Sequence, residues 1–372
     1  MSLRDIEDFA LERHFARWEF AVDHQLSASD VEPLRLRELL ALADADGRER
    51  WESLALGYTE SRGLPALREA IVALYPGLAP DDVFVLAGAE EGILLTMHAA
   101  LAAGDEAVVV TPAYQSLVAV PRSLGARVVP VPLREDRGWE LDPDEVQRAV
   151  TPRTRVIAIN FPHNPTGAHI SPGVQRRLLE IADAAGATLL SDEVYHGLEH
   201  SSEALPPAAS LSAGAVSLGV VSKSYALAGL RIGWIATRNR AVMDRVVRLK
   251  DYTTICSSAP SEVLALIALR ARGKILERSR AIVADNLRRA SDFATRFHSD
   301  VAWTPPRAGS TAFPRFTARN ADDVSQRLAT QARVLVLPGS VFGCDPAFFR
   351  LGLGRRDFPE ALKALERYLD RG

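Results

Sequence analysis

The sequence has few cysteines and no long apolar run. Its 372 residues contain two cysteines, Cys256 and Cys344, far apart and in no CxxC arrangement. This excludes a disulfide framework and fits a reducing compartment. No apolar run approaches the length of a membrane-spanning helix, and the acidic start MSLRDIEDFA lacks the apolar segment of a secretory signal. We therefore expect a cytoplasmic protein, and because the eight histidines are scattered, no bound metal.

Patterns typical of nucleotide and nucleic-acid binding are also missing. The chain has no GxxxxGK[ST] loop and no GxGxxG turn after the first predicted strand, which argues against a nucleotide-binding α/β protein. The net charge of −3 leaves no basic excess for nucleic acid or an anionic membrane. No basic region or helix-turn-helix extension points to a regulator that keeps the fold only as a sensor. Small molecules are the expected partners.

Short apolar runs alternate with helical segments over the first two thirds of the chain. Runs that are apolar on both faces and alternate with helices are typical of a largely parallel sheet covered on both sides. The expected fold class is therefore α/β, with a mainly parallel seven-stranded sheet flanked by helices. The predicted strands are 82–88, 106–112, 126–132, 155–162, 187–193, 215–222 and 231–237.

The pattern changes after about residue 255. A helical pattern over 260–297 is long enough to predict a kinked or broken helix. Short strands and an amphipathic C-terminal helix follow. We predict a large domain over 45–255 and a smaller α+β domain made of 1–44 and 256–372.

Three predicted strands end in polar clusters, HNPTG, SDEVY and SKS. In open parallel sheets ligands bind beyond the carboxyl ends of strands, so these clusters are expected to meet. Each side chain alone has a structural explanation: a helix cap, a turn, core or an ion pair. The clusters offer an amine, a carboxylate and hydrogen-bond donors, and Arg231 at the start of the last predicted strand adds a guanidinium. Together these groups are what pyridoxal 5′-phosphate (PLP) needs. The residues are Asn164, Asp192, Tyr195, Lys223 and Arg231.

These motifs resemble, in order and spacing, the PLP-dependent class I/II aminotransferases of fold type I. SKSYALAGLRIGW is similar to the SK…GLRIG motif, which implies a Schiff base on Lys223 and a phosphate contact from Arg231. NFPHNPTG resembles the NPTG motif and implies that Asn164 contacts the cofactor O3′ and helps to bind substrate. SDEVY resembles the D-E-x-Y motif, which implies that Asp192 pairs with the pyridine nitrogen and that Tyr195 contacts O3′.

The resemblance extends upstream and downstream. LAGAEEGILL is similar to the phosphate-binding helix start, which implies backbone contacts from Ala89 and Glu90; the Glu90 side chain would have to turn away. TPAYQS implies that Tyr114 stacks on the pyridine ring. GYTESRGL implies a homodimer in which Tyr58 reaches the phosphate of the partner's site. FFRLGLG implies that Arg350 binds the substrate α-carboxylate.

Two segments depart from the family pattern. Val220 replaces a hydroxyl-bearing residue three positions before the lysine, so Ser222 is the hydroxyl expected at the phosphate. HQLSASDVEPLRLREL replaces the usual glycine-bearing N-terminal stretch and is similar to the capreomycidine synthase branch, whose members cyclise an arginine derivative. Ser27 and Ser29 in this stretch either line the pocket or cap a helix, and we favour the cap. His163 and His196 either tune the pocket or fill space near it.

The resemblance implies transamination, in which an L-amino acid gives its amino group to a 2-oxo acid, with Lys223, Asp192 and Tyr195 as catalytic residues. A PLP-dependent cyclase or β/γ-elimination lyase is the alternative, because the same residues would serve its first deprotonation. The sequence does not identify the amino donor. Its side chain is expected to meet the N-terminal segment, the loop around Tyr114 and the partner subunit.

Overall fold

The computed structural model describes residues 6–200 and 203–370. Its centre is a seven-stranded sheet in the order β2-β8-β7-β6-β5-β3-β4. All seven predicted strands are present, which confirms the expected fold class. The strands are parallel except β8, which runs antiparallel to both neighbours. Their bounds are β2 (Val83–Leu86), β3 (Glu106–Thr111), β4 (Arg127–Pro132), β5 (Thr154–Asn160), β6 (Thr188–Asp192), β7 (Ala215–Val220) and β8 (Gly233–Ala236).

Alternate residues of the strands pack into different hydrophobic clusters. In β3, Ala107 and Val109 belong to one cluster, while Val108 and Val110 belong to another. Because side chains alternate along a strand, the sheet is buried on both faces, as the continuous apolar runs predict. The covering helices are α4 (Pro65–Val72), α5 (Ala89–Ala100), α6 (Ser116–Ser123), α7 (Pro143–Ala149), α8 (Pro172–Ala185), α9 (Ala208–Leu211), α10 (Arg240–Lys250) and α11 (Ala259–Arg270).

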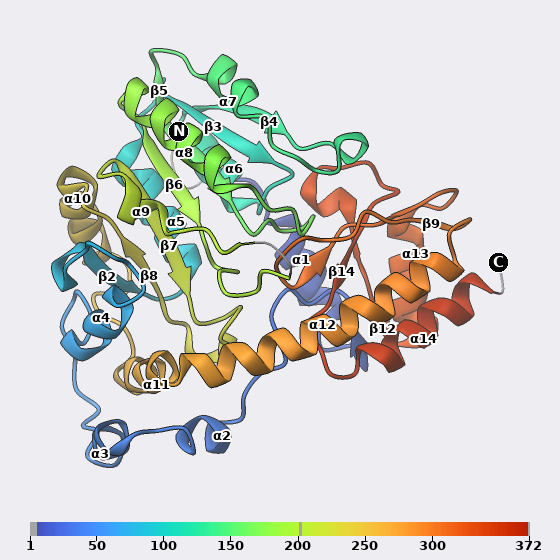
Figure 1. The fold of residues 1–372 in the computed structure, drawn as a ribbon, viewed down its shortest axis with the longest axis horizontal. Coiled ribbons are helices and arrows are strands. Elements are labelled where there is room, and N and C mark those ends of the chain that lie inside the picture. Colours follow the sequence, from blue (N-terminus) through green and yellow to red (C-terminus); the bar gives the residue numbers. More distant parts are fainter. Residues whose placement is uncertain (1–5, 201–202, 371–372) are drawn as a thin grey trace.

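The long helical pattern after residue 255 is broken, as predicted. Helix α11 ends at Arg270, and α12 (Arg272–Arg296) extends from it towards α13 (Ala321–Arg327) and α14 (Phe358–Leu369) (Figure 1). The short strands of this part are β9 (Val301–Ala302), β10 (Thr311–Ala312), β11 (Arg315–Phe316), β12 (Val334–Leu335), β13 (Leu337–Pro338) and β14 (Phe349–Gly352). No helix in the described ranges is long and apolar enough to cross a membrane.

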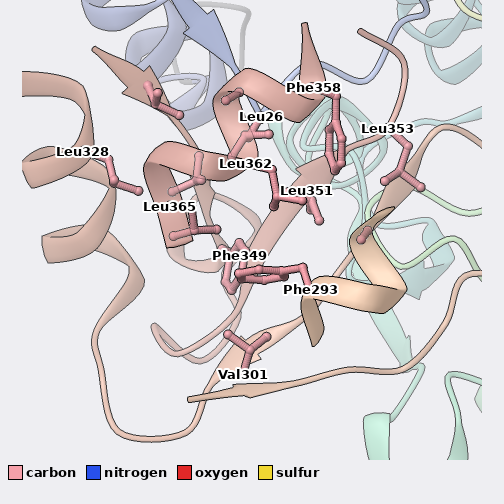
Figure 2. Packing of buried hydrophobic residues seen from close by; sticks show 14 of the residues in the cluster. Leu26, Phe293, Val301, Leu328, Phe349, Leu351, Leu353, Phe358, Leu362 and Leu365 are labelled. Atoms are coloured by element: carbon pink, nitrogen blue, oxygen red, sulfur yellow. The ribbon is translucent and has the colours of Figure 1, made fainter. Parts of the chain in front are cut away.

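The N-terminal segment joins the C-terminal part of the chain. Strand β1 (His24–Gln25) pairs in parallel with β12, and Leu26 lies in a hydrophobic cluster with Phe293, Phe349 and Leu351 (Figure 2). Helices α1 (Ala10–Trp18), α2 (Leu36–Leu40) and α3 (Ala45–Glu52) complete this end of the chain. The pairing supports a small domain built from both ends, although its boundaries at 45 and 255 stay predictions.

Two glycines of FFRLGLG allow the N-terminal segment to lie against β14. A Cβ atom on Gly352 would be 1.9 Å from the carbonyl oxygen of Ala28, and one on Gly354 would be 2.1 Å from that of Asp30. The backbone N–H of Gly352 also donates to the carbonyl of Leu26. Residues 27–30 are therefore held close to the strand that carries Arg350.

We expect Gly352→Ala to lower the free energy of unfolding by about 1–3 kcal/mol, because overpacking of this kind costs that much. Urea denaturation followed by circular dichroism measures the change. Gly273→Ala is the matched control, since a Cβ at this helical position meets nothing within 4 Å, and alanine is the better helix former. Equal stability of the two variants would contradict the close packing of residues 27–30.

Candidate active site

A cavity of about 380 Å³ lies at the carboxyl ends of β5, β6 and β7. Its volume is within the range of small-molecule sites. The three polar clusters do meet here, as expected from the sheet topology. The predicted residues that line it are Ala89, Glu90, Tyr114, Asn164, Asp192, Tyr195, Ser222, Lys223 and Arg231. Their individual roles stay predictions.

Asn160 also lines the cavity and was not predicted from the sequence. Its side-chain amide donates to the Asp192 carbonyl at 2.9 Å, and its Oδ1 accepts from the backbone N–H of Asn164 at 2.9 Å. It therefore ties the ends of β5 and β6 to the NPTG loop. A polar residue closing the buried run RVIAIN was the available signal.

Asp192 is buried at the end of β6. Burial raises the pKa of its carboxyl to about 7, against the backbone N–H of Val194 and the charge of Lys223, which both lower it. The Val194 N–H donates to Asp192 Oδ1 at 3.2 Å. A cation placed beside this carboxyl would favour its ionised form, so the residue is suited to hold a protonated ring nitrogen.

Lys223 faces the cavity and is only partly buried. Its Nζ donates to Ser29 Oγ at 2.8 Å and lies 5.9 Å from the centroid of the Tyr195 ring. The interpretation of Ser29 as a helix cap is therefore wrong, since α2 begins seven residues later with Arg35 as its N-cap. Ser27 is not a cap either; it is fully buried and its Oγ has no hydrogen-bond partner within the described residues.

One end of the cavity is suited to an anion. Helix α5 starts there with Gly88 as N-cap and no side-chain cap, which leaves its N-terminus open to an anion. Gly88 has φ +94°, and a Cβ on it would lie 2.6 Å from Arg231 Nη2, so only glycine lets the guanidinium reach this helix start. Arg231 Nη1 lies 3.5 Å from Ser222 Oγ. Val220 also lines the cavity, in keeping with the departure seen in the sequence.

Glu90 is one of the residues that line the cavity, and its carboxyl accepts from Ser116 Oγ at 3.0 Å. The expectation that this side chain turns away from the phosphate stays a prediction. Burial raises its pKa to about 7, assisted by the charge of Glu12 and opposed by Ser116 and Arg231. The carboxyl therefore ionises near neutral pH, beside the end of the cavity that is suited to an anion.

We expect ionisation of Glu90 between pH 6 and pH 8 to weaken PLP binding by on the order of tenfold, because the ionised carboxylate repels the phosphate. In Glu90→Gln this part of the pH dependence should disappear. Equilibrium titrations with PLP at each pH measure the affinity. Pyridoxal, which lacks the phosphate, is the control for pH effects that do not involve the phosphate. The same pH slope in both proteins would contradict the assignment.

Arg350 lies outside the cavity lining and is 1% exposed. Its Nε and Nη2 donate to the Ser27 carbonyl at 3.1 and 2.7 Å, and Nη1 donates to Asn164 Oδ1 at 3.1 Å. A guanidinium has five N–H groups, so within the described residues these contacts leave one N–H on each Nη. That pair matches a carboxylate in two parallel hydrogen bonds.

The N-terminal segment forms a wall of the cavity, as expected, but of its lining side chains only Ser29 was considered from the sequence. Glu12 accepts from the Tyr114 hydroxyl at 3.3 Å. Asp30 is paired with Arg355 at 2.9 Å. The other wall residues from this segment are Phe15, Glu19, Gln25, Ala28 and Ser29. Nothing in the local sequence shows that α1 reaches a strand end more than 140 residues away.

The two histidines near the motifs do not line the cavity. His163 is buried against Phe161, with its Nδ1 2.8 Å from Thr166 Oγ1, and burial lowers its pKa to about 3. It fills space behind the NPTG loop. His196 is exposed, and although His200 follows four residues later, no group of three potential metal ligands occurs in the described part of the chain.

The residues present fit PLP. The cavity offers an amine for its aldehyde, a buried carboxyl for its ring nitrogen, and an open helix N-terminus with a guanidinium for its phosphate. The glycine at residue 88 provides the close approach that this phosphate end needs. Together with the sheet topology, these features define a PLP-dependent enzyme of fold type I.

The chain belongs to the aminotransferase class I and II family, whose profile matches residues 39–365. It is 34% identical to capreomycidine synthase of Streptomyces vinaceus over 342 residues, which cover 91% of this chain and 86% of the relative. Its fold matches a PLP-dependent aminotransferase from Streptococcus suis, with a TM-score of 0.93, 29% identity and coverage of 99% and 98%. It also matches the PLP-dependent cyclase OrfR, with a TM-score of 0.90, 32% identity and full coverage of both chains. The family and cofactor expected from the sequence are confirmed.

Proposed function

We propose that this enzyme is an aminotransferase that moves the amino group of an L-amino acid to a 2-oxo acid. The observation that carries the proposal is the Lys223 amine in the same cavity as Asp192 and the open start of α5, with Arg350 beside it. PLP, when bound, acts as an electron sink that makes the Cα–H of the substrate acidic. Lys223 would accept that proton.

The surrounding residues position the substrate and favour charge on the ring. Arg350 would take the α-carboxylate with the two N–H groups that Ser27 and Asn164 leave free. Asp192 would hold the proton of the ring nitrogen. Tyr195 and Asn164 line the same cavity and would donate to the phenolic oxygen.

The acidic residues of the cavity wall favour one kind of amino donor. Three acidic residues of the N-terminal segment line the cavity, namely Glu12, Glu19 and Asp30. Arg355 is a basic residue that lines it as well. Burial raises the pKa of Glu19, and the charges of Asp30 and Glu12 raise it further. We propose a donor with a cationic side chain, such as arginine, because a cation offsets this repulsion.

A PLP-dependent cyclase or β/γ-elimination lyase is the second candidate. It is favoured by the 34% identity to capreomycidine synthase and the 32% identity to the cyclase OrfR. Both reactions begin with the same proton transfer to Lys223, and they differ in what leaves the substrate afterwards.

The deciding experiment follows the absorption of PLP-loaded protein during addition of single L-amino acids, without a 2-oxo acid. Transamination converts bound PLP to pyridoxamine phosphate, and we expect this with arginine or another cationic donor. Release of ammonia or of a cyclic product without pyridoxamine phosphate would overturn the proposal in favour of the second candidate.

We also propose a homodimer in which Tyr58 reaches the partner's site. Tyr58 and Tyr252 are each 91% exposed, and Leu56 and Ile255 are exposed beside them in sequence. Thr59 donates to the Ser257 carbonyl at 3.2 Å, so the two segments that carry these exposed side chains adjoin. Mixing Tyr58→Ala with Lys223→Ala subunits tests the arrangement, because one site of the mixed dimer would be intact and activity would return.

A further inference from the structure

Ser29 Oγ is the hydrogen-bond partner of the Lys223 amine among the residues that the structure describes. The two atoms are 2.8 Å apart, and both side chains line the cavity. Lys223 Nζ also lies over the face of the Tyr195 ring, 5.9 Å from the ring centroid. Ser29 comes from the N-terminal segment, which departs from the family pattern, and lies 194 residues from Lys223 in sequence.

The backbone around Ser29 is fixed on several sides. Its own carbonyl accepts from Ser310 Oγ at 2.6 Å. The carboxylate of Asp30 binds Arg355 with both oxygens, at 2.9 and 3.1 Å. The close approach of Gly352 and Gly354 allows no room for this segment to move towards β14. The hydroxyl is therefore held in place rather than carried on a free loop.

We propose that Ser29 is a positioning residue that orients the Lys223 amine for proton transfer, an inference that rests on the proposed function. A neutral amine has two N–H groups and one lone pair. When Ser29 Oγ accepts one N–H, rotation about the Cε–Nζ bond is restricted and the lone pair stays directed to one side. The proton leaves the substrate Cα for that lone pair, and the electron pair of the C–H bond remains with the substrate.

The same contact stabilises the product of that step. The ammonium of Lys223 has three N–H groups, and Ser29 still accepts one of them after the transfer. A hydrogen bond to a charged donor is stronger than one to a neutral donor, so the contact favours the protonated lysine. No net proton is gained or lost by Ser29.

Exchange of the Cα proton of the amino donor with solvent deuterium, followed by NMR without a 2-oxo acid, tests the role. This exchange reports on Lys223 whether the enzyme is an aminotransferase or a cyclase. We expect Ser29→Ala to slow it roughly ten- to a hundredfold, the range for one hydrogen bond to a charged group. The KM of the donor should change little, and the isotope effect with Cα-deuterated donor should rise.

A second readout does not depend on turnover. The Lys223 amine of the apoprotein captures PLP, and the absorption change gives the rate, which we expect to fall several-fold in Ser29→Ala. Ser29→Thr keeps the hydroxyl and should restore most of both rates. Ser279→Ala is the control, since it removes a serine hydroxyl of α12 that lies outside the cavity lining and has no hydrogen-bond partner within the described residues.

Normal exchange and capture by Ser29→Ala would overturn the inference, and so would equal losses in Ser29→Ala and Ser29→Thr, which would indicate a structural role. Failure of the proposed function has a different outcome. In that case the wild-type protein exchanges the Cα proton but forms no pyridoxamine phosphate, while the effect of Ser29→Ala on exchange persists.

Discussion

Lys223→Ala is expected to abolish covalent attachment of PLP and to slow the reaction of the amino donor by about 10²–10⁴-fold, the usual contribution of a general base. The variant keeps Asp192, Arg231 and the open start of α5, so PLP should still bind without a covalent bond. Borohydride reduction followed by mass spectrometry of peptides measures the attachment. Stopped-flow absorption measures the rate.

The other lysines make this experiment specific, because the chain has only four. Lys274 and Lys363 are exposed, and Lys250 is buried and paired with Glu91 at 3.2 Å. Lys274→Ala is the matched control and should react as the wild type does. A reduced PLP adduct on any lysine other than Lys223, or unchanged turnover by Lys223→Ala, would contradict the assignment of Lys223 as the lysine that binds PLP.

Much of the fold and of the cofactor end of the site follows from local sequence. Apolar runs of strand length identify the sheet, and polar residues that close such runs must lie at its carboxyl edge. Asn164, Asp192 and Lys223 were found in this way, since Asp192 ends a buried strand and the other two lie within four residues of the end of one. The break between α11 and α12 followed from the length of the pattern.

The substrate side of the site depends on contacts that local sequence does not encode. Ser29 reaches Lys223 only because β1 pairs with β12 and because Gly352 and Gly354 let the segment approach β14. Such pairing is decided by tertiary packing. The reversed direction of β8 was not predicted for the same reason, since an apolar run looks alike in either direction.

Glu90 shows how a local pattern can be right about the backbone and silent about the side chain. The resemblance placed the start of α5 at the anion end, where the structure has it. The direction of the carboxyl is set by Ser116, which lies on another element. Only the assembled cavity therefore reveals a titrating group beside the phosphate end.

Arg350→Ala is expected to raise the KM for the amino acid and for the 2-oxo acid by roughly a hundredfold or more, the range for losing a charged bidentate contact. PLP binding should persist, because Lys223, Asp192 and Arg231, which line the cavity, are unchanged in this variant. Steady-state kinetics with both substrates, together with a PLP titration, separates the two effects. Arg327→Lys, at an exposed position of α13, is the control for loss of a guanidinium.

Arg350→Lys should recover little of this loss. A lysine is a single point charge and cannot serve the Ser27 carbonyl, Asn164 and a carboxylate from one planar group. It would leave the buried Ser27 carbonyl short of donors, which costs about 1–3 kcal/mol of stability. Unfolding measurements on both variants detect that cost. If Arg350→Lys kept the wild-type KM values, the carboxylate would have to bind elsewhere, and the pair of N–H groups left free on Arg350 would have no part in substrate binding.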